Sequence, residues 1–106
     1  MIVIADTSPI NYLILIGEID ILPLLYGRII IPNTVLHELG AGSAPTLVKN
    51  WLLTPPEWLE IRSISTTIER DLSDFLDLGE SEAIQMAEEF DADLLIIDEN
   101  SDVRSL

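Results

Sequence analysis

Two short apolar runs, each closed by an aspartate, constrain the fold of this chain more than any other feature. Residues 1–5 are wholly apolar and end at Asp6, and residues 94–97 are wholly apolar and end at Asp98. Such runs are typical of strands buried on both faces of a parallel sheet. The carboxyl ends of parallel strands share one edge, and open α/β sheets bind their ligands at that edge. We therefore expect Asp6 and Asp98 to gather at a binding edge.

The rest of the chain alternates strand-like and helix-like segments, which predicts an α/β fold, a three-layer α/β/α sandwich with a parallel sheet. The predicted strands are residues 2–5, 28–31, 58–64 and 94–97, the third of them a short exposed or edge strand. The predicted helices are residues 10–16, 19–26, 32–39, 44–53, 68–76 and 80–90.

Local signals refine three of these helices. Thr7 or Ser8 can cap the first helix, and Pro9 suits its first turn. Residues 10–16 are almost wholly apolar, so we expect this helix to be buried. Gly17 should end the first helix, Gly27 should turn the chain after the second, and residues 77–79 should form a break before the last.

Composition narrows the chemistry. The chain has 106 residues, of which 48% are hydrophobic, so a single domain with a real core is expected. The absence of cysteine excludes disulfides and thiolate zinc sites, and a single histidine, His37, excludes a histidine-rich metal site. The formal charge of −14 is unusual for a nucleic-acid binder, and it fits a metal pocket, a basic protein partner or a solvated acidic surface.

The sequence also indicates where the protein acts. Residues 10–25 are very apolar, but polar and charged residues interrupt them, so the segment is too short and too broken to span a membrane. No charged segment precedes the first apolar run, as a signal peptide would require. We therefore expect a cytoplasmic protein with no membrane segment.

Acidic side chains gathered at one sheet edge repel one another and lose hydration, so a cation is expected among them. Asp6 and Asp98 end strands, while Glu38 and Glu80 lie in helix-like segments. Carboxylate oxygens are the ligands that Mg²⁺ and Mn²⁺ prefer. The pattern therefore points to metal-assisted phosphoryl chemistry.

Four segments in this order resemble the PIN domain family, in its VapC-like branch of small prokaryotic proteins. They are residues 5–10, residues 31–39 with their Val-Leu-His-Glu-Leu run, residues 78–84 with Leu-Gly-Glu-Ser-Glu-Ala-Ile, and residues 95–99. The resemblance implies an α/β/α fold and a Mg²⁺- or Mn²⁺-dependent ribonuclease acting on RNA. Many such proteins are toxins of toxin–antitoxin pairs, so an antitoxin protein is an expected partner.

The resemblance also assigns roles to the acidic residues. Asp6, Glu38, Glu80 and Asp98 would form the catalytic quartet. Asp6, Glu80 and Asp98 would hold the metal directly or through waters, and Glu38 would bind metal or orient the attacking water. Asp6 can instead cap a helix, but we favour the ligand role because Thr7 and Ser8 can cap.

Neighbouring acids compete for these roles. Glu80, rather than Glu82, has the family's spacing from Asp98, and residues two apart on a helix point to different sides. Glu82 can still approach through a water. Glu99 should face the opposite side of the sheet from Asp98. Asp102 is a candidate for an additional acid, although a solvated or capping role is the better reading.

The chain departs from the family at its end, because PIN domains usually continue through another helix and strand. We expect residues 1–106 to form a single PIN-like domain without those elements, and a homodimer to supply the cover. The alternative is a catalytically weak or inactive PIN remnant that acts as a dimerising interaction module. Two other acidic-pocket classes fit poorly. Receiver domains need a lysine on a later strand, where Lys49 does not lie, and haloacid-dehalogenase-type phosphatases need Asp-x-Asp where the chain has Asp6-Thr7-Ser8.

Overall fold

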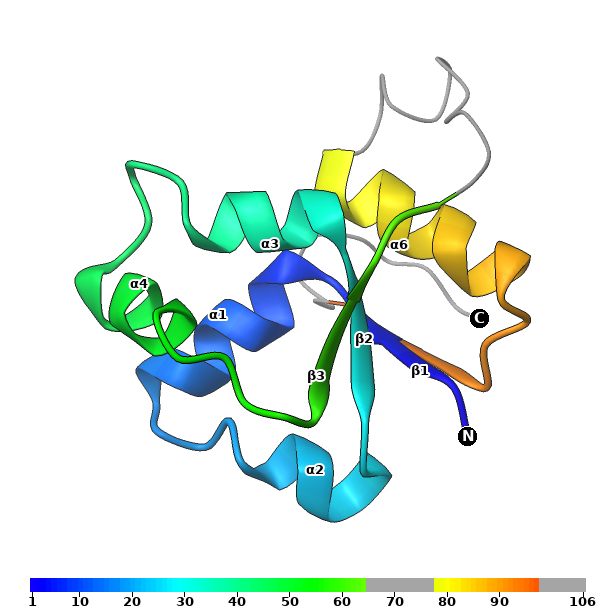
Figure 1. Ribbon diagram of the computed structural model, residues 1–106, viewed down its shortest axis with the longest axis horizontal. Coiled ribbons are helices and arrows are strands. Elements are labelled where there is room, and N and C mark those ends of the chain that lie inside the picture. The colour runs from blue at the N-terminus through cyan, green and yellow to red at the C-terminus, as the bar shows by residue number, and fades with distance from the viewer. Residues whose placement is uncertain (65–77, 98–106) are drawn as a thin grey trace.

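A four-stranded parallel sheet forms the centre of the protein. The computed structural model describes residues 1–64 and 78–97 (Figure 1). The strands stand in the order β3-β2-β1-β4, and every pairing between neighbours is parallel. They are β1 (Val3–Ala5), β2 (Ile29–Pro32), β3 (Leu59–Arg62) and β4 (Leu94–Ile96). The predicted α/β class is confirmed, and β3 lies at a sheet edge as expected.

Five helices surround this sheet within the described residues. They are α1 (Thr7–Leu15), α2 (Ile21–Tyr26), α3 (Asn33–Leu39), α4 (Thr46–Leu52) and α6 (Leu78–Glu89). The break expected at residues 77–79 is wrong for Leu78 and Gly79, which form the first turn of α6. A carboxylate from α3 accepts a hydrogen bond from the Gly79 N–H, and this contact holds the glycine in the first turn of α6. The predicted helix at residues 68–76 lies outside the described residues.

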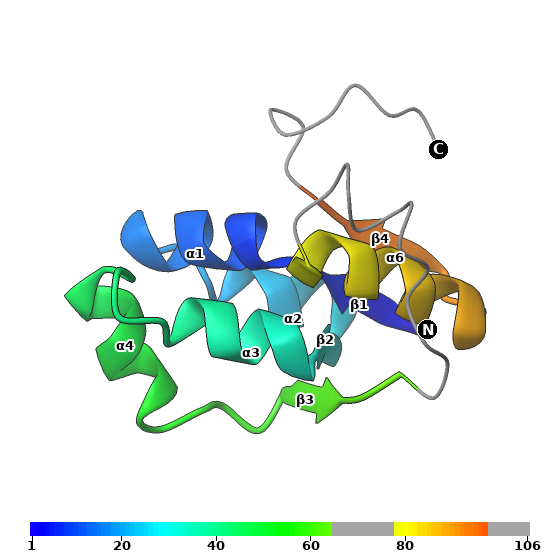
Figure 2. The same cartoon turned by 90° about the horizontal axis from the view of Figure 1, so that it is seen from above.

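The sheet has a hydrophobic core on each face. Side chains alternate across a strand, so Val3 and Ala5 of β1 join a core with α1–α4, while Ile4 packs towards α6. Figure 1 and Figure 2 show α6 on one side of the sheet and α1, α3 and α4 on the other. The two cores confirm the three-layer arrangement, and all three residues of β1 are fully buried.

The two glycines expected at turns occupy left-handed backbone. Gly17 has φ 76° after α1, and Gly27 has φ 80° after α2. Residues with a Cβ rarely adopt these angles, so glycine is the suitable residue at both turns. The chain can therefore reverse after each helix and lead into the next element.

The expectation that residues 10–16 are buried is wrong for much of this segment. Ile10 and Ile14 are buried, whereas Tyr12 is 62% exposed and Leu15 and Ile16 are also exposed. The cause is geometric, because a helix lying on a sheet presents only one stripe of its surface to that sheet. The remaining apolar side chains of α1 therefore reach the surface.

The packing generates a stability prediction. Ile31 is fully buried in the middle of β2. Replacing it by alanine removes buried methyl groups and leaves a cavity, so Ile31→Ala should lower the free energy of unfolding by about 2–5 kcal/mol. Urea denaturation followed by circular dichroism measures this. Leu53→Ala is the control, because Leu53 is exposed and its loss should change stability by about 0.5 kcal/mol or less.

Candidate active site

Asp6 lies where β1 ends and α1 begins. Its backbone N–H donates to the Ile96 carbonyl of β4 at 3.0 Å, which continues the pairing of the two strands. Asp6 occupies the N-cap position of α1, but its side chain makes no capping hydrogen bond. The carboxylate is only 2% exposed. Capping therefore does not engage this carboxylate, which favours the ligand role over the cap.

The direction of the Asp6 side chain follows from strand alternation. The backbone at Asp6 is still extended, with φ −88° and ψ 175°. Asp6 therefore continues the side of β1 that Ile4 occupies, which is the side covered by α6. This places the carboxylate on the face of the sheet where α6 packs against β1.

Glu38 comes from α3 and joins two other elements. Its Oε1 accepts a hydrogen bond from the Thr7 hydroxyl at the start of α1. Its Oε2 accepts a hydrogen bond from the Gly79 N–H at the start of α6, at 3.0 Å. Both carboxylate oxygens thus have partners within the protein. Neighbouring His37 is exposed, as expected for a surface residue.

Glu80 follows Gly79 in the first turn of α6. It is only 3% exposed, whereas Glu82 is half-buried. Negative charge is favourable at a helix N-terminus, because the first N–H groups of the helix point towards it. Glu80 is more buried than Glu82, and it also has the family's spacing from Asp98. Glu80 therefore remains the better candidate ligand.

Two contributions were not predicted from the sequence. Thr7 was expected to cap the first helix, but its hydroxyl donates to Glu38. Ser81 is fully buried, and within the described part of the chain its Oγ has no hydrogen-bond partner. The Leu-Gly-Glu-Ser-Glu segment was interpreted through its two glutamates, which are candidate metal ligands. Nothing in its pattern distinguishes a buried serine from a solvated one.

The sheet topology explains why these segments meet at one edge. From β1 the chain leads to β2 on one side, while β4 pairs on the other side. The point between β1 and β4 is therefore the place where strand order reverses, and α/β folds commonly bind ligands there. Asp6 stands at this point. Asp98 lies outside the described residues, as do Glu99 and Asp102.

The donor chemistry of this edge fits a hard divalent cation. Asp6 and Glu80 supply buried carboxylate oxygens, the type of donor that Mg²⁺ and Mn²⁺ prefer. Among residues 1–64 and 78–97, however, no group of three or more Asp, Glu, His or Cys side chains could hold a metal ion. The arrangement is consistent with this, because Glu38 is engaged by protein groups and Asp98 lies outside these ranges.

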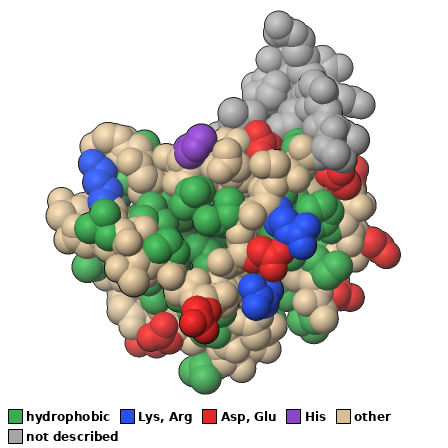
Figure 3. Space-filling model, in the orientation of Figure 1, with side chains coloured by type: hydrophobic (Ala, Val, Ile, Leu, Met, Phe, Trp, Pro, Cys, Tyr) green, Lys and Arg blue, Asp and Glu red, His purple; other side chains and the backbone are tan. Residues whose placement is uncertain are grey.

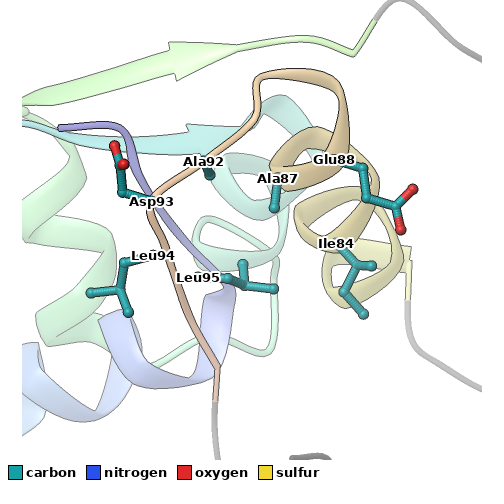
Figure 4. Close-up of a pocket in the computed structure, with 7 residues that line it drawn as sticks. All are labelled: Ile84, Ala87, Glu88, Ala92, Asp93, Leu94 and Leu95. Carbon is teal, nitrogen blue, oxygen red and sulfur yellow. The ribbon is translucent and has the colours of Figure 1, made fainter. Parts of the chain in front are cut away.

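A separate hollow lies between α6 and β4. It encloses about 290 Å³, and its lining is mainly apolar (Figure 4). Ile84 and Ala87 of α6 line one side of it, and Leu94 and Leu95 of β4 line the other. None of the predicted acidic site residues lines this hollow, so we do not assign the catalytic chemistry to it.

The basic side chains of the described residues make local contacts. Arg28 and Arg62 both pair with Glu60 of β3, and Figure 3 shows basic and acidic groups together over this strand. Arg62 also lies 5.7 Å from the ring centre of Phe90. The Lys49 ammonium donates to a backbone carbonyl. These groups are engaged in local contacts and form no basic stripe for nucleic acid.

Comparison with known families decides the identity of the fold. A family model described as a PIN domain matches residues 2–104. The chain belongs to the PIN domain family. Comparisons with curated proteins and with solved structures gave no significant match. PIN domains are generally nucleases that use divalent metal ions, and the family suggests RNA binding.

The PIN assignment agrees with the parallel sheet and with the acidic edge. In the part of the chain that the structure describes, no helix has the length and apolar character needed to cross a membrane.

Proposed function

We propose that this PIN domain is a metal-dependent ribonuclease that hydrolyses phosphodiester bonds in RNA. The observation that carries the proposal is the placement of Asp6 and Glu80. Both carboxylates are buried, and they belong to elements that meet at the carboxyl edge of the parallel sheet. Burying carboxylates is costly unless a cation or hydrogen bonds compensate. Carboxylate oxygens at this edge are the donors that Mg²⁺ and Mn²⁺ prefer, and parallel α/β sheets bind their ligands there.

The proposed roles follow the positions of the side chains. Asp6, Glu80 and Asp98 would hold Mg²⁺ or Mn²⁺, directly or through waters, and Glu38 would complete the catalytic quartet. When bound, such an ion supplies an acidic water and neutralises charge on the phosphate oxygens. The water oxygen would form a bond to phosphorus and lose one proton to solvent, while the bond from phosphorus to the leaving ribose oxygen breaks and that oxygen takes up a proton from solvent. The buried carboxylates keep this part of the site at a fixed geometry.

We further propose that the protein is the toxin-like component of a toxin–antitoxin pair of the VapC-like type. The chain carries 19 acidic and 5 basic residues, so its surface would attract a basic protein partner. An antitoxin with a basic segment has the required chemistry. An RNA substrate and such a partner would both place the protein in the cytoplasm.

A homodimer is part of the same proposal. Apolar side chains of α1 and α2 are exposed, among them Tyr12 and Leu25, and Leu24 is 84% exposed. Figure 3 shows hydrophobic side chains at the surface over α2. Exposed apolar patches of this kind commonly mark interfaces, and a two-fold dimer would bury them against each other. The same surface also supports the alternative, an inactive interaction module. The RNA cleavage experiment below distinguishes this module from a nuclease.

The first prediction concerns cleavage. The purified protein should cleave single-stranded RNA in the presence of Mn²⁺, and Asp6→Asn should reduce the rate by about a hundredfold or more, because even outer-shell changes at metal sites cost 10–100-fold. Glu57→Gln removes an exposed acid far from the site and should leave the rate unchanged. Equal rates for the wild type and Asp6→Asn would indicate a contaminating nuclease and favour the interaction module.

The second prediction concerns metal binding. A cation that binds only the folded protein should stabilise it by about 2.7 kcal/mol at a hundredfold excess over its dissociation constant. The melting temperature should therefore rise on addition of Mn²⁺, and Asp6→Asn should remove most of the rise. A rise of the same size in this variant would mean that Mn²⁺ only screens the surface charge.

The third prediction concerns assembly. Sedimentation at micromolar concentration should show a dimer, and Leu24→Glu should weaken it at least about tenfold, because it places a charge in the apolar interface. Leu53→Glu changes a comparably exposed leucine outside α1 and α2 and should leave the dimer intact. A compact species of 11.8 kDa for the wild type would contradict the proposed homodimer.

A further inference from the structure

We propose that Glu38 is a positioning residue whose carboxylate, seated against Thr7 and Gly79, holds the first turn of α6 and therefore Glu80 in place. This inference rests on the proposed nuclease function and deepens it. It gives Glu38 a role through its neighbour Glu80, in addition to its place among the four acids of the proposed site. It also gives Gly79, a residue with no side chain, a defined part in the site.

The hydrogen bonds of Glu38 are the first support. Oε1 accepts the Thr7 hydroxyl, and Oε2 accepts the Gly79 N–H at 3.0 Å. A carboxylate that accepts two bonds from separate elements is held in one orientation. Each oxygen thus serves to join α3 to another helix, at the start of α1 and at the start of α6.

The place of Gly79 in α6 is the second support. The first N–H groups of a helix have no partner within it, and Gly79 is the second residue of α6. Glu38 supplies the missing acceptor from a distant part of the chain. Its negative charge also lies where the helix dipole favours it. Because Glu80 is the next residue, fixing the Gly79 amide fixes the backbone from which the Glu80 side chain extends.

The third support is the close packing of the Glu38 carboxylate against Gly79. Gly79 is not among the glycines with left-handed backbone, so its conformation does not require glycine. A Cβ at this position would lie 2.8 Å from the Cδ of Glu38 and closer still to Oε1. Real Cβ atoms essentially never approach other atoms so closely. A Cβ at position 79 would therefore displace the Glu38 carboxylate, which can move because it is the end of a flexible side chain.

The test uses variants that separate positioning from metal ligation. Glu38→Ala removes the contacts, and Gly79→Ala pushes the carboxylate out of its seat. Glu38→Gln keeps the contacts, because its carbonyl can accept the Gly79 N–H and its amide can donate to the Thr7 hydroxyl oxygen. Gly42→Ala is the matched control, because a Cβ at Gly42 meets no atom within 4 Å.

Two quantities are measured on the full-length protein. The first is hydrogen exchange of the amide at position 79 without metal, followed by NMR. The second is the dissociation constant for Mn²⁺, from calorimetric titration. Glu38→Ala and Gly79→Ala should each lower amide protection and weaken Mn²⁺ binding by about tenfold or more, as the loss of a hydrogen bond to a charged group commonly does. Glu38→Gln should stay within about threefold of the wild type in both, because the neutral amide loses only the charge component.

Other results would overturn the inference. If Glu38→Gln weakens Mn²⁺ binding as much as Glu38→Ala does, Glu38 is a metal ligand. If Gly79→Ala behaves like Gly42→Ala, the close approach has no role. Thr7→Val repeats the test, because it removes the hydroxyl that donates to Glu38 and leaves Glu38 and Gly79 unchanged. Thr7→Ser keeps a hydroxyl and should restore the wild-type result.

The exchange measurement keeps this inference separate from the proposed function. A wild-type protein that binds no Mn²⁺ contradicts the metal-dependent nuclease. In that case the amide at position 79 still decides whether Glu38 positions α6, since its protection is measured without metal. Loss of protection in Glu38→Ala supports the positioning role, and unchanged protection refutes it.

Discussion

The pairing of β1 with strands on both of its sides is the constraint on which the rest of the structure depends. Ile4 pairs with Ile30 of β2 and with Leu95 of β4, and both pairings are parallel. Parallel pairing brings the carboxyl ends of all these strands to one edge, and each strand must then leave through a helix. Asp6 lies at this edge because it directly follows β1, and all three residues of β1 are buried. The position of Asp6 is thus a consequence of strand order.

The start of α6 is held from outside the helix. Gly79 is a weak helix former, costing about 0.8–1.0 kcal/mol relative to alanine in a helix interior. A hydrogen bond to a charged group contributes about 1.5–3 kcal/mol, so the contact with Glu38 outweighs that cost. In the proposed role of Glu38, local helix stability is exchanged for a defined position of Glu80. Such an exchange is common where catalytic groups have to be held within a narrow geometry.

Much of the fold could be predicted from the sequence because it depends on patterns within one element. The apolar run before Asp6 and the helical spacing after Glu80 are local signals, and the structure places a strand and a helix there. The exposed side of α1 was not predictable, because apolar character alone does not show how much of a helix the sheet covers. The role of Gly79 was missed since it depends on Glu38, a contact across 41 residues of sequence.

The pairing of the first strand with the last has a consequence for how the protein folds. The Ile2 N–H donates to the Asp93 carboxylate at 2.6 Å, a contact between residues 91 positions apart along the chain. Pairings across such distances form late, because closing a long loop costs entropy before any contact compensates. During synthesis β1 and β2 can meet early, whereas β4 leaves the ribosome only after most of the chain. The edge between β1 and β4 is therefore assembled after the pairing of β1 with β2, and a chain that stops before β4 cannot present it.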